Sequence, residues 1–282
     1  MAAAHQIDDR GCICTFRIAP FSRRGFVAGA ALVLAAAAVR TVGAVEAIPA
    51  IAAAADLNYA LREIADHFSK DTGKDVRLSF GSSGDFTTQI RQGAPFQVFL
   101  SADEEYVEAL NKEGKTDGEG TLYAVGRIGL FAPTGSPLKV DGELRDLTAA
   151  LKDGRLQKFA IANPEHAPYG RAARAALEHA GLWGAIVRKL VLGEDVVQAT
   201  QFAASGLAQG GIISLSLAKA PAVAQAGTFA LIPEVWHPPL LQRMVLLKGA
   251  SDTARAFYDY MQTQPAREVL KRYGFVLPGE EG

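Results

Sequence analysis

Short apolar runs alternate with amphipathic helical patterns from residue 50 onward, which is typical of an α/β protein. The clearest helix follows the first apolar run, because apolar residues recur every three or four positions from Leu57 to Phe68 and Gly73 then provides a stop signal. Strands are predicted at 49–55, 76–80, 98–100, 123–131, 159–162, 211–213 and 229–232. Helices are predicted at 57–69, from the turn at 81–84 to near 93, and at 104–110, 170–180, 196–207 and 251–262.

The N-terminal segment has the pattern of an export signal rather than of a folded element. Arg23 and Arg24 precede an apolar and small-residue run of 14 residues, Phe26 to Val39, which is too short to cross a bilayer that needs about 20 residues. The paired arginines favour the twin-arginine route over the general secretory route. Small residues at 42–44 or 45–47 suit signal peptidase, so we predict an export signal at 1–47 and a periplasmic protein.

Removal of this signal would change the chemistry that the chain offers. The 282 residues carry 29 basic and 30 acidic side chains, and the signal contains five arginines and three acids, so the remainder would have a net charge of −3. A chain with no excess of positive charge is a poor candidate for nucleic-acid binding. Both cysteines, Cys12 and Cys14, would be lost, which excludes thiolate catalysis, disulfides and thiolate metal sites.

The domain organisation stays open on pattern alone. About 235 residues follow the predicted signal, and no linker rich in serine, glycine or proline divides them. The chain therefore forms either one large sheet or two lobes joined by strands that cross between them.

Four strand-to-helix junctions place small, hydroxyl or acidic residues directly before a helix. The first N–H groups of a helix are unpaired and carry a partial positive charge, so such junctions are natural anion sites. Ordinary helix capping is the favoured explanation of each junction when it is taken singly. The junctions are Ala55-Asp56-Leu57, Ser82-Ser83-Gly84, Pro168-Tyr169-Gly170 and Glu194-Asp195-Val196.

Enzyme chemistry finds little support in the sequence. A Gly-x-Ser-x-Gly elbow is absent, and no nucleophile lies in a recognisable pattern with a base. The histidines beyond the signal, His67, His166, His179 and His237, show no paired metal-ligand spacing. We therefore predict no catalytic residue, no cofactor and no direct metal ligand, with an exported hydrolase or transferase as the remote alternative.

Taken together, the junctions and their surroundings resemble the molybdate-binding proteins of molybdenum ABC transporters. The matching stretches follow the order of that family and cover nearly the whole chain after the signal. They are Ala53-Ala54-Ala55-Asp56-Leu57, Phe80-Gly81-Ser82-Ser83-Gly84, Gly93-Ala94-Pro95-Phe96-Gln97-Val98-Phe99-Leu100-Ser101-Ala102-Asp103, Asn163-Pro164-Glu165-His166-Ala167-Pro168-Tyr169-Gly170, Glu194-Asp195-Val196, Phe257-Tyr258-Asp259-Tyr260 and Lys271-Arg272-Tyr273-Gly274-Phe275.

The resemblance implies a type II periplasmic-binding-protein fold, with an oxyanion held in the cleft between two α/β lobes. Lobe one would comprise 48–125 plus 238–282, and lobe two 126–237, with crossovers at 123–131 and around His237. The function implied is capture of molybdate, and of tungstate too, by a monomer that delivers it to an ABC permease. A receptor for another tetrahedral oxyanion, such as phosphate or sulfate, is the alternative.

The resemblance also implies the contacts, at Ala55, Asp56, Ser83, Tyr169 and Val196. Ser83 would donate from its hydroxyl and N–H, Tyr169 from its N–H and hydroxyl, and Val196 from its N–H alone. Uncharged donors suit this task, because hydrogen bonds to a charged group contribute roughly 1.5 to 3 kcal/mol each and cost less desolvation than buried lysines. The serine or threonine hydroxyl that the family often has near Asp56, and the tyrosine near Ser214, are missing here.

Asp56 is discordant, because a carboxylate pointed at a dianion would repel it. We expect its side chain to turn back and cap the helix at 57–69 while its N–H faces the ligand. The alternative is that Asp56 accepts a proton-bearing ligand oxygen, which would suit hydrogen phosphate or arsenate.

Overall fold

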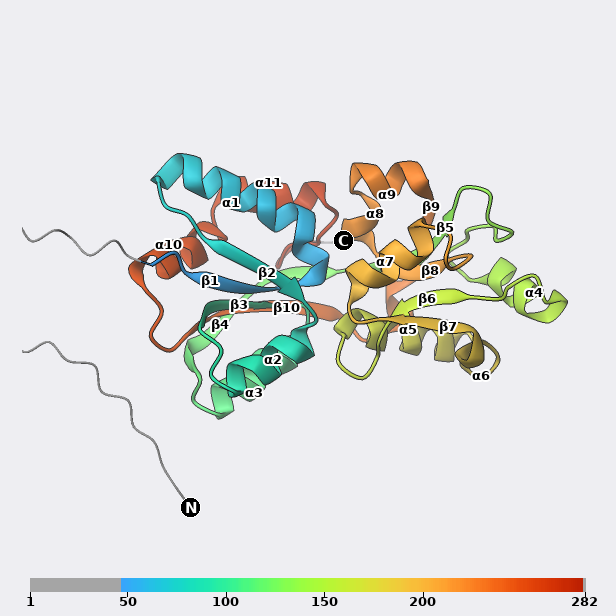
Figure 1. The fold of residues 1–282 in the computed structure, drawn as a ribbon, viewed down its shortest axis with the longest axis horizontal. Helices are drawn as coiled ribbons and strands as arrows, with labels where there is room; N and C mark the ends of the chain where they lie inside the picture. Colours follow the sequence, from blue (N-terminus) through green and yellow to red (C-terminus); the bar gives the residue numbers. More distant parts are fainter. Residues whose placement is uncertain (1–46, 281–282) are drawn as a thin grey trace, which may run out of the picture. The chain divides into compact units, whose positions relative to one another are not determined.

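The computed structural model describes residues 47–280, which fold as an α/β protein with two separate five-stranded sheets (Figure 1). The predicted export signal and both cysteines fall in 1–46 and lie outside the described residues, apart from Ala47 at the end of the predicted signal. Within 47–280, no helix is long and apolar enough to span a membrane. The fold class expected from the alternating pattern is confirmed.

The first sheet has the order β2-β1-β3-β10-β4 and combines parallel and antiparallel pairs. Strand β1 runs parallel to β2 and β3, whereas β10 is antiparallel to β3 and β4. The bounds are β1 Ala50–Ala54, β2 Arg77–Gly81, β3 Phe96–Ser101, β4 Thr116–Gly126 and β10 Leu240–Leu247.

The second sheet repeats this mixed arrangement in the order β7-β6-β8-β5-β9. Strand β6 is parallel to β7 and β8, and β5 is antiparallel to β8 and β9. The bounds are β5 Ile128–Pro133, β6 Phe159–Ala162, β7 Leu190–Gly193, β8 Gly211–Ser214 and β9 Gly227–Leu231.

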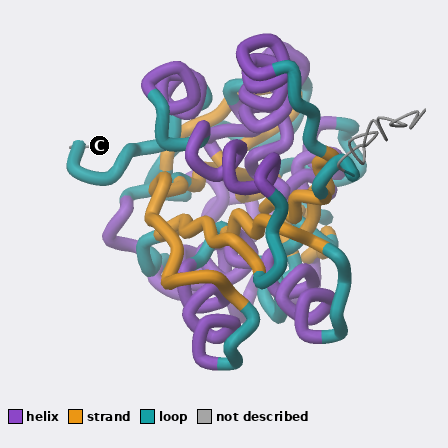
Figure 2. Tube along the Cα trace, turned by 90° about the vertical axis from the view of Figure 1, so that its left-hand side faces the viewer, coloured by secondary structure: helices purple, strands orange, loops and turns teal. Residues whose placement is uncertain are grey.

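Helices surround the strands of both sheets (Figures 1 and 2). Helices α1 and α11 lie on one side of the first sheet and α2 and α3 on the other; α7, α8 and α9 lie opposite α5 and α6 across the second (Figure 1). The bounds are α1 Asn58–Thr72, α2 Ser83–Arg91, α3 Glu104–Lys112, α4 Arg145–Asp153, α5 Pro168–His179, α6 Trp183–Ile186, α7 Val196–Ala204, α8 Leu215–Ala218, α9 Pro221–Ala226, α10 Asp252–Tyr260 and α11 Gln264–Arg272, with 3₁₀ turns η1 Ala55–Leu57, η2 Val187–Lys189 and η3 Glu234–Trp236.

The chain passes between the sheets twice. Strands β4 and β5 are separated only by Arg127, so the run at 123–131, expected as one strand, is two strands in different sheets. The return passes from β9 to β10 through η3 and His237. These two short connections replace a flexible linker and hold the sheets next to each other.

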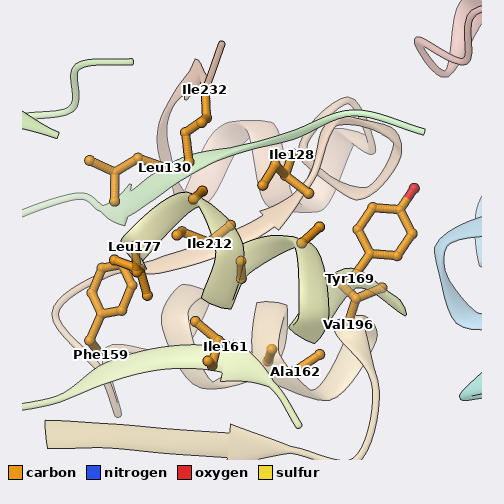
Figure 3. Close-up of a cluster of buried hydrophobic side chains, with 14 of the residues drawn as sticks. Ile128, Leu130, Phe159, Ile161, Ala162, Tyr169, Leu177, Val196, Ile212 and Ile232 are labelled. Carbon is orange, nitrogen blue, oxygen red and sulfur yellow. The ribbon is translucent and has the colours of Figure 1, made fainter. Parts of the chain in front are cut away.

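Each sheet has its own apolar core, and the largest cluster also contacts the first sheet. The centre of this cluster lies on the second sheet, where it includes the packed side chains of Ile128, Leu130, Phe159 and Ile161 (Figure 3). Burial of such side chains contributes roughly 1.5 to 3 kcal/mol each. Tyr169 closes one end of this cluster, with its ring packed and its hydroxyl pointing away from the other side chains (Figure 3).

Candidate functional site

One small cavity gathers the four predicted junctions, two from each sheet. It is lined where β1, β2 and the segment after β3 meet the N-termini of α5 and α7. All five predicted site residues lie on its wall. The lining comprises Ala54, Ala55, Asp56, Gly81, Ser82, Ser83, Ala102, Ala167, Pro168, Tyr169, Asp195 and Val196.

The size of the cavity limits what it can enclose. Its volume is about 10 Å³, close to the smallest that holds one water molecule. Such a space suits one compact ion and excludes a sugar, an amino acid or a nucleotide in this conformation.

Helix N-termini supply uncharged donors to the cavity. Ser83 and Val196 are the first residues of α2 and α7, and Tyr169 is the second residue of α5. The first N–H groups of a helix have no partner within it. Among the turn and cap hydrogen bonds of residues 47–280, none uses the N–H groups of these three residues. They remain available to an anion, which the helix dipoles also favour.

Neighbouring side chains do the capping and leave these donors exposed to the cavity. Ser82 Oγ accepts from the N–H of Asp85 at 3.2 Å, and Asp195 Oδ1 accepts from the N–H of Gln198 at 2.9 Å. Ser83 Oγ accepts from the N–H of Ala102 at 3.0 Å, so its own proton stays free to donate. Ser83 therefore has two donors without a partner at the cavity, its N–H and its hydroxyl.

Asp56 does not cap a helix, contrary to our expectation. It lies inside the 3₁₀ turn η1, and its side chain makes no cap hydrogen bond. Instead, its Oδ2 accepts from the Tyr169 hydroxyl at 2.8 Å and from the Gln242 amide at 2.6 Å. The physical reason is that the buried Asp56 side chain lies within hydrogen-bond distance of donors from α5 and β10, and it bonds them instead of the N–H groups at the start of α1. The Tyr169 hydroxyl, predicted to face the ligand, donates to Asp56.

The buried network continues behind Asp56 and includes residues that sequence reasoning missed. Tyr123 donates from its hydroxyl to Gln242 Oε1 at 2.7 Å, which orients the Gln242 amide toward Asp56. Ser216 donates to the Asp56 carbonyl at 2.8 Å, so a serine hydroxyl does reach Asp56, although from α8. The only sequence signal for Gln242 is a polar residue, next to Arg243, at a buried position of a strand whose other residues are apolar.

Burial controls the charge of Asp56. The residue is 1% exposed, and desolvation raises the pKa of its carboxyl from 3.8 to about 6, with hydrogen bonds from Gln242 and Tyr169 partly opposing this rise. Its Oδ1 is buried and has no hydrogen-bond partner among the described residues. Burial also raises the pKa values of Tyr123 and Tyr169 well above 10, so both phenols are neutral donors.

Contacts beside the cavity join the first sheet's elements to the second's. The His166 carbonyl accepts from the N–H of Gly84 and from Ser82 Oγ, both at 3.1 Å. Arg171 of α5 pairs with Asp103 and lies over the Tyr106 ring. A β-carbon on Gly84 would stand 2.5 Å from the His166 oxygen, so this close approach requires glycine. The described conformation is therefore one in which the two halves are closed on each other.

One cluster near the cavity could in principle hold a metal ion. His166 lies 3.5 Å from Asp85 and 3.7 Å from Glu194. Sequence spacing gave no sign of this grouping, because it joins the first turn of α2 to two loops that are distant in the chain. Both carboxylates are exposed, and Ser82 Oγ already contacts the imidazole at 3.0 Å. The cluster is more simply a set of polar contacts at the edge of the closed cavity.

The comparisons place this fold of two mixed sheets, with its compact cavity at helix N-termini, among solute-binding proteins. Residues 50–276 match the model of the bacterial extracellular solute-binding protein family. The chain belongs to this family.

Individual relatives of known function narrow the comparison to molybdate-binding proteins. The molybdate-binding protein ModA of Azotobacter vinelandii is 39% identical over 230 residues, which span 80% of this chain and 89% of the relative. ModA of Rhodobacter capsulatus is also 39% identical, over 80% of this chain and 86% of the relative. The solved structure of the Azotobacter vinelandii periplasmic molybdate-binding protein superposes with a TM-score of 0.73 at 31% identity, covering 82% of this chain and 99% of that chain.

Proposed function

We propose that this protein is a periplasmic receptor that captures molybdate, and tungstate as well, and delivers it to an ABC permease. The main observation that supports this function is the cavity, in which Ser83, Tyr169 and Val196 present unpaired N–H groups from three helices. The similarity to ModA proteins supports molybdate as the anion. Binding with closure of the lobes, rather than turnover, is the activity.

The contacts to the anion follow from the donors. Ser83 donates from its hydroxyl and N–H, and Tyr169 and Val196 donate from their N–H groups, while Ala55 packs against the ion. A tetrahedral dianion has four oxygens to be satisfied, and a cage of neutral dipoles selects it without the desolvation cost of buried lysines. The division into lobe one, 48–125 plus 238–282, and lobe two, 126–237, makes each lobe contribute two junctions.

Titration calorimetry on the purified protein with molybdate, tungstate, sulfate and phosphate tests this function. We expect tight, one-to-one binding of molybdate and tungstate and much weaker binding of the two others. Replacement of Ser83 by Ala removes one charge-assisted donor and is expected to weaken molybdate binding by roughly 10- to 100-fold. Tight phosphate binding without molybdate binding would identify the alternative receptor.

Closure has its own test at Gly84. A G84A substitution places a methyl group against the His166 carbonyl and should hold the lobes apart, which weakens molybdate binding without removing any donor. Gly184 of α6 has open space around its β-carbon position, so G184A serves as a matched control. Equal affinities in both variants would show that the closed contact at Gly84 is not needed for capture.

A further inference from the structure

The two oxygens of the Asp56 carboxyl have opposite environments. Oδ2 accepts two hydrogen bonds, from Tyr169 and Gln242, whereas Oδ1 has no partner on another described residue and is out of contact with solvent. The backbone N–H of Asp56 itself also interacts with the carboxyl and opposes the rise of its pKa, less than Gln242 and Tyr169 do. A buried, unpaired carboxylate oxygen costs free energy unless something satisfies it. Asp56 also lines the anion cavity, so the bound anion is the natural partner for Oδ1.

Charge decides in which form Oδ1 can meet an anion. An ionised carboxylate beside a dianion in a desolvated cavity would be strongly repelled. A protonated carboxyl is neutral and donates one hydrogen bond. Because Oδ2 already accepts from two donors, the proton belongs on Oδ1, the oxygen that lacks a partner.

The groups that face Asp56 give no cation that could relieve the repulsion. Tyr169 from α5 and Tyr123 from β4 are neutral phenols, and Gln242 from β10 is an amide. Ser216 from α8 contacts Asp56 at its backbone carbonyl and not at its carboxyl. Asp195 at the start of α7 adds negative charge and raises the pKa of Asp56 further. Among the described residues, no lysine, arginine or histidine lines the cavity.

We propose that Asp56 holds the captured oxyanion as a neutral carboxyl, donating a hydrogen bond from Oδ1, so that capture of the fully deprotonated dianion takes up one proton from solvent. The proton adds to Asp56, and no bond within the anion is made or broken. This inference rests on the proposed function and adds a proton requirement to the same site.

The pH range follows from the direction of the Asp56 shift. With its pKa raised to about 6 before binding, Asp56 is already neutral in acid, so affinity is constant below that pH. Above it, each bound dianion requires proton uptake, and affinity falls by up to tenfold per pH unit. The fall ends where the pH passes the still higher pKa of the bound state.

Calorimetric titration with sodium molybdate between about pH 6 and pH 8.5, in buffers of different ionisation enthalpy, measures the dissociation constant and the number of protons taken up per anion. We expect the dissociation constant to rise by roughly 30- to 100-fold across this range. The buffer dependence of the enthalpy should approach one proton taken up per anion near pH 8. A constant affinity with no proton uptake would overturn the proposal.

Substitutions identify the group responsible. D56N keeps the shape and supplies a permanent N–H donor, so its molybdate affinity should be independent of pH and exceed the wild-type value at about pH 8 by at least tenfold. D195N is the matched control, because it removes the other acidic charge on the cavity wall and retains a capping side chain; its affinity should still fall with pH. A pH dependence that persists in D56N would assign the proton to another group.

Phosphate separates this proposal from the alternative reading of Asp56. In that alternative, an ionised Asp56 accepts a hydrogen bond from the protonated oxygen of hydrogen phosphate. Phosphate affinity should then rise as the pH passes 6 and should be lost in D56N. This result would overturn the proposal. Failure of molybdate to bind at every pH would overturn the proposed function instead, which the wild-type titration reveals separately.

Discussion

Asp56 follows a strand of the first sheet and Asp195 follows a strand of the second, and the two acids have different roles. Both are acids at a strand-to-helix junction, and both line the cavity. Asp195 caps α7 through the N–H of Gln198 and is partly exposed. Asp56 is buried, caps nothing, and bonds Tyr169 and Gln242 from distant elements.

The difference shows what decides the role of an acid at a helix start. A cap is local, because donor and acceptor are three residues apart in the chain. The network of Asp56 depends on partners 113 and 186 residues away, which meet it only after both sheets have formed. Where such partners and full burial are available, they override the local preference and shift the pKa of the acid.

The largest expected difference between the two acids is in how each makes the free energy of unfolding depend on pH. The folded-state pKa of Asp56 is about 6 and exceeds its unfolded value of 3.8. The contribution of the Asp56 carboxyl to the free energy of unfolding is therefore fully present below pH 3.8 and is lost as the pH rises through 6. This group should cost the unliganded protein about 3 kcal/mol between about pH 4 and pH 8. Denaturant unfolding of wild type, D56N and D195N at several pH values measures it.

Only D56N should lack this loss, and D195N should retain most of it, because the charge of Asp195 is the smallest of the causes that shift the pKa of Asp56. Because other titrating groups are common to all three proteins, their contributions cancel in the difference. Parallel curves for wild type and D56N would mean that burial does not perturb Asp56.

A smaller effect is expected at Tyr169. Y169F removes the hydroxyl that donates to Asp56 Oδ2, so it should raise the pKa of Asp56 further and destabilise the protein by about 2 kcal/mol at pH 8. Below about pH 5 the carboxyl is neutral and the loss should fall to about 1 kcal/mol.

The matched control is Y258F, since the Tyr258 hydroxyl bonds the neutral Thr121 hydroxyl at 2.8 Å. Its unfolding free energy should change by the same amount at both pH values. A pH-independent loss in Y169F as well would argue against an ionising partner for Tyr169.

The smallest effect belongs to the capping acid. D195A removes the side chain that accepts from Gln198 and should cost about 1 kcal/mol, whereas D195N, which still caps, should be nearly neutral. Thermal or denaturant unfolding distinguishes the two. An equal loss in both variants would mean that the negative charge of Asp195, rather than the cap, stabilises α7.

The sequence predicted those parts of the fold and site that depend on local pattern. The periodicity from Leu57 to Phe68 and the stop at Gly73 correspond to α1, and the junctions at Ser83, Tyr169 and Val196 begin helices at the cavity. These features are readable because helix starts and stops are determined within a few residues.

The parts that were missed depend on long-range contacts. Strand β10 was not predicted, although it lies between β3 and β4 in the first sheet, and β7 was missed at the edge of the second sheet. Gln242 has only a weak local signal, a buried polar position in a mostly apolar run, because its role comes from Tyr123 on the neighbouring strand β4 and from Asp56 across the site. Pairing partners from distant segments, not local periodicity, create such elements.

Crystals grown with molybdate, measured at a wavelength where molybdenum scatters anomalously, test the central claim most directly. We predict one strong anomalous peak inside the cavity, with its oxygens in hydrogen-bond contact with the N–H groups of Ser83, Tyr169 and Val196 and with one oxygen against Asp56 Oδ1. An anomalous peak elsewhere, with the cavity filled only by water, would contradict the assignment of this cavity as the oxyanion site.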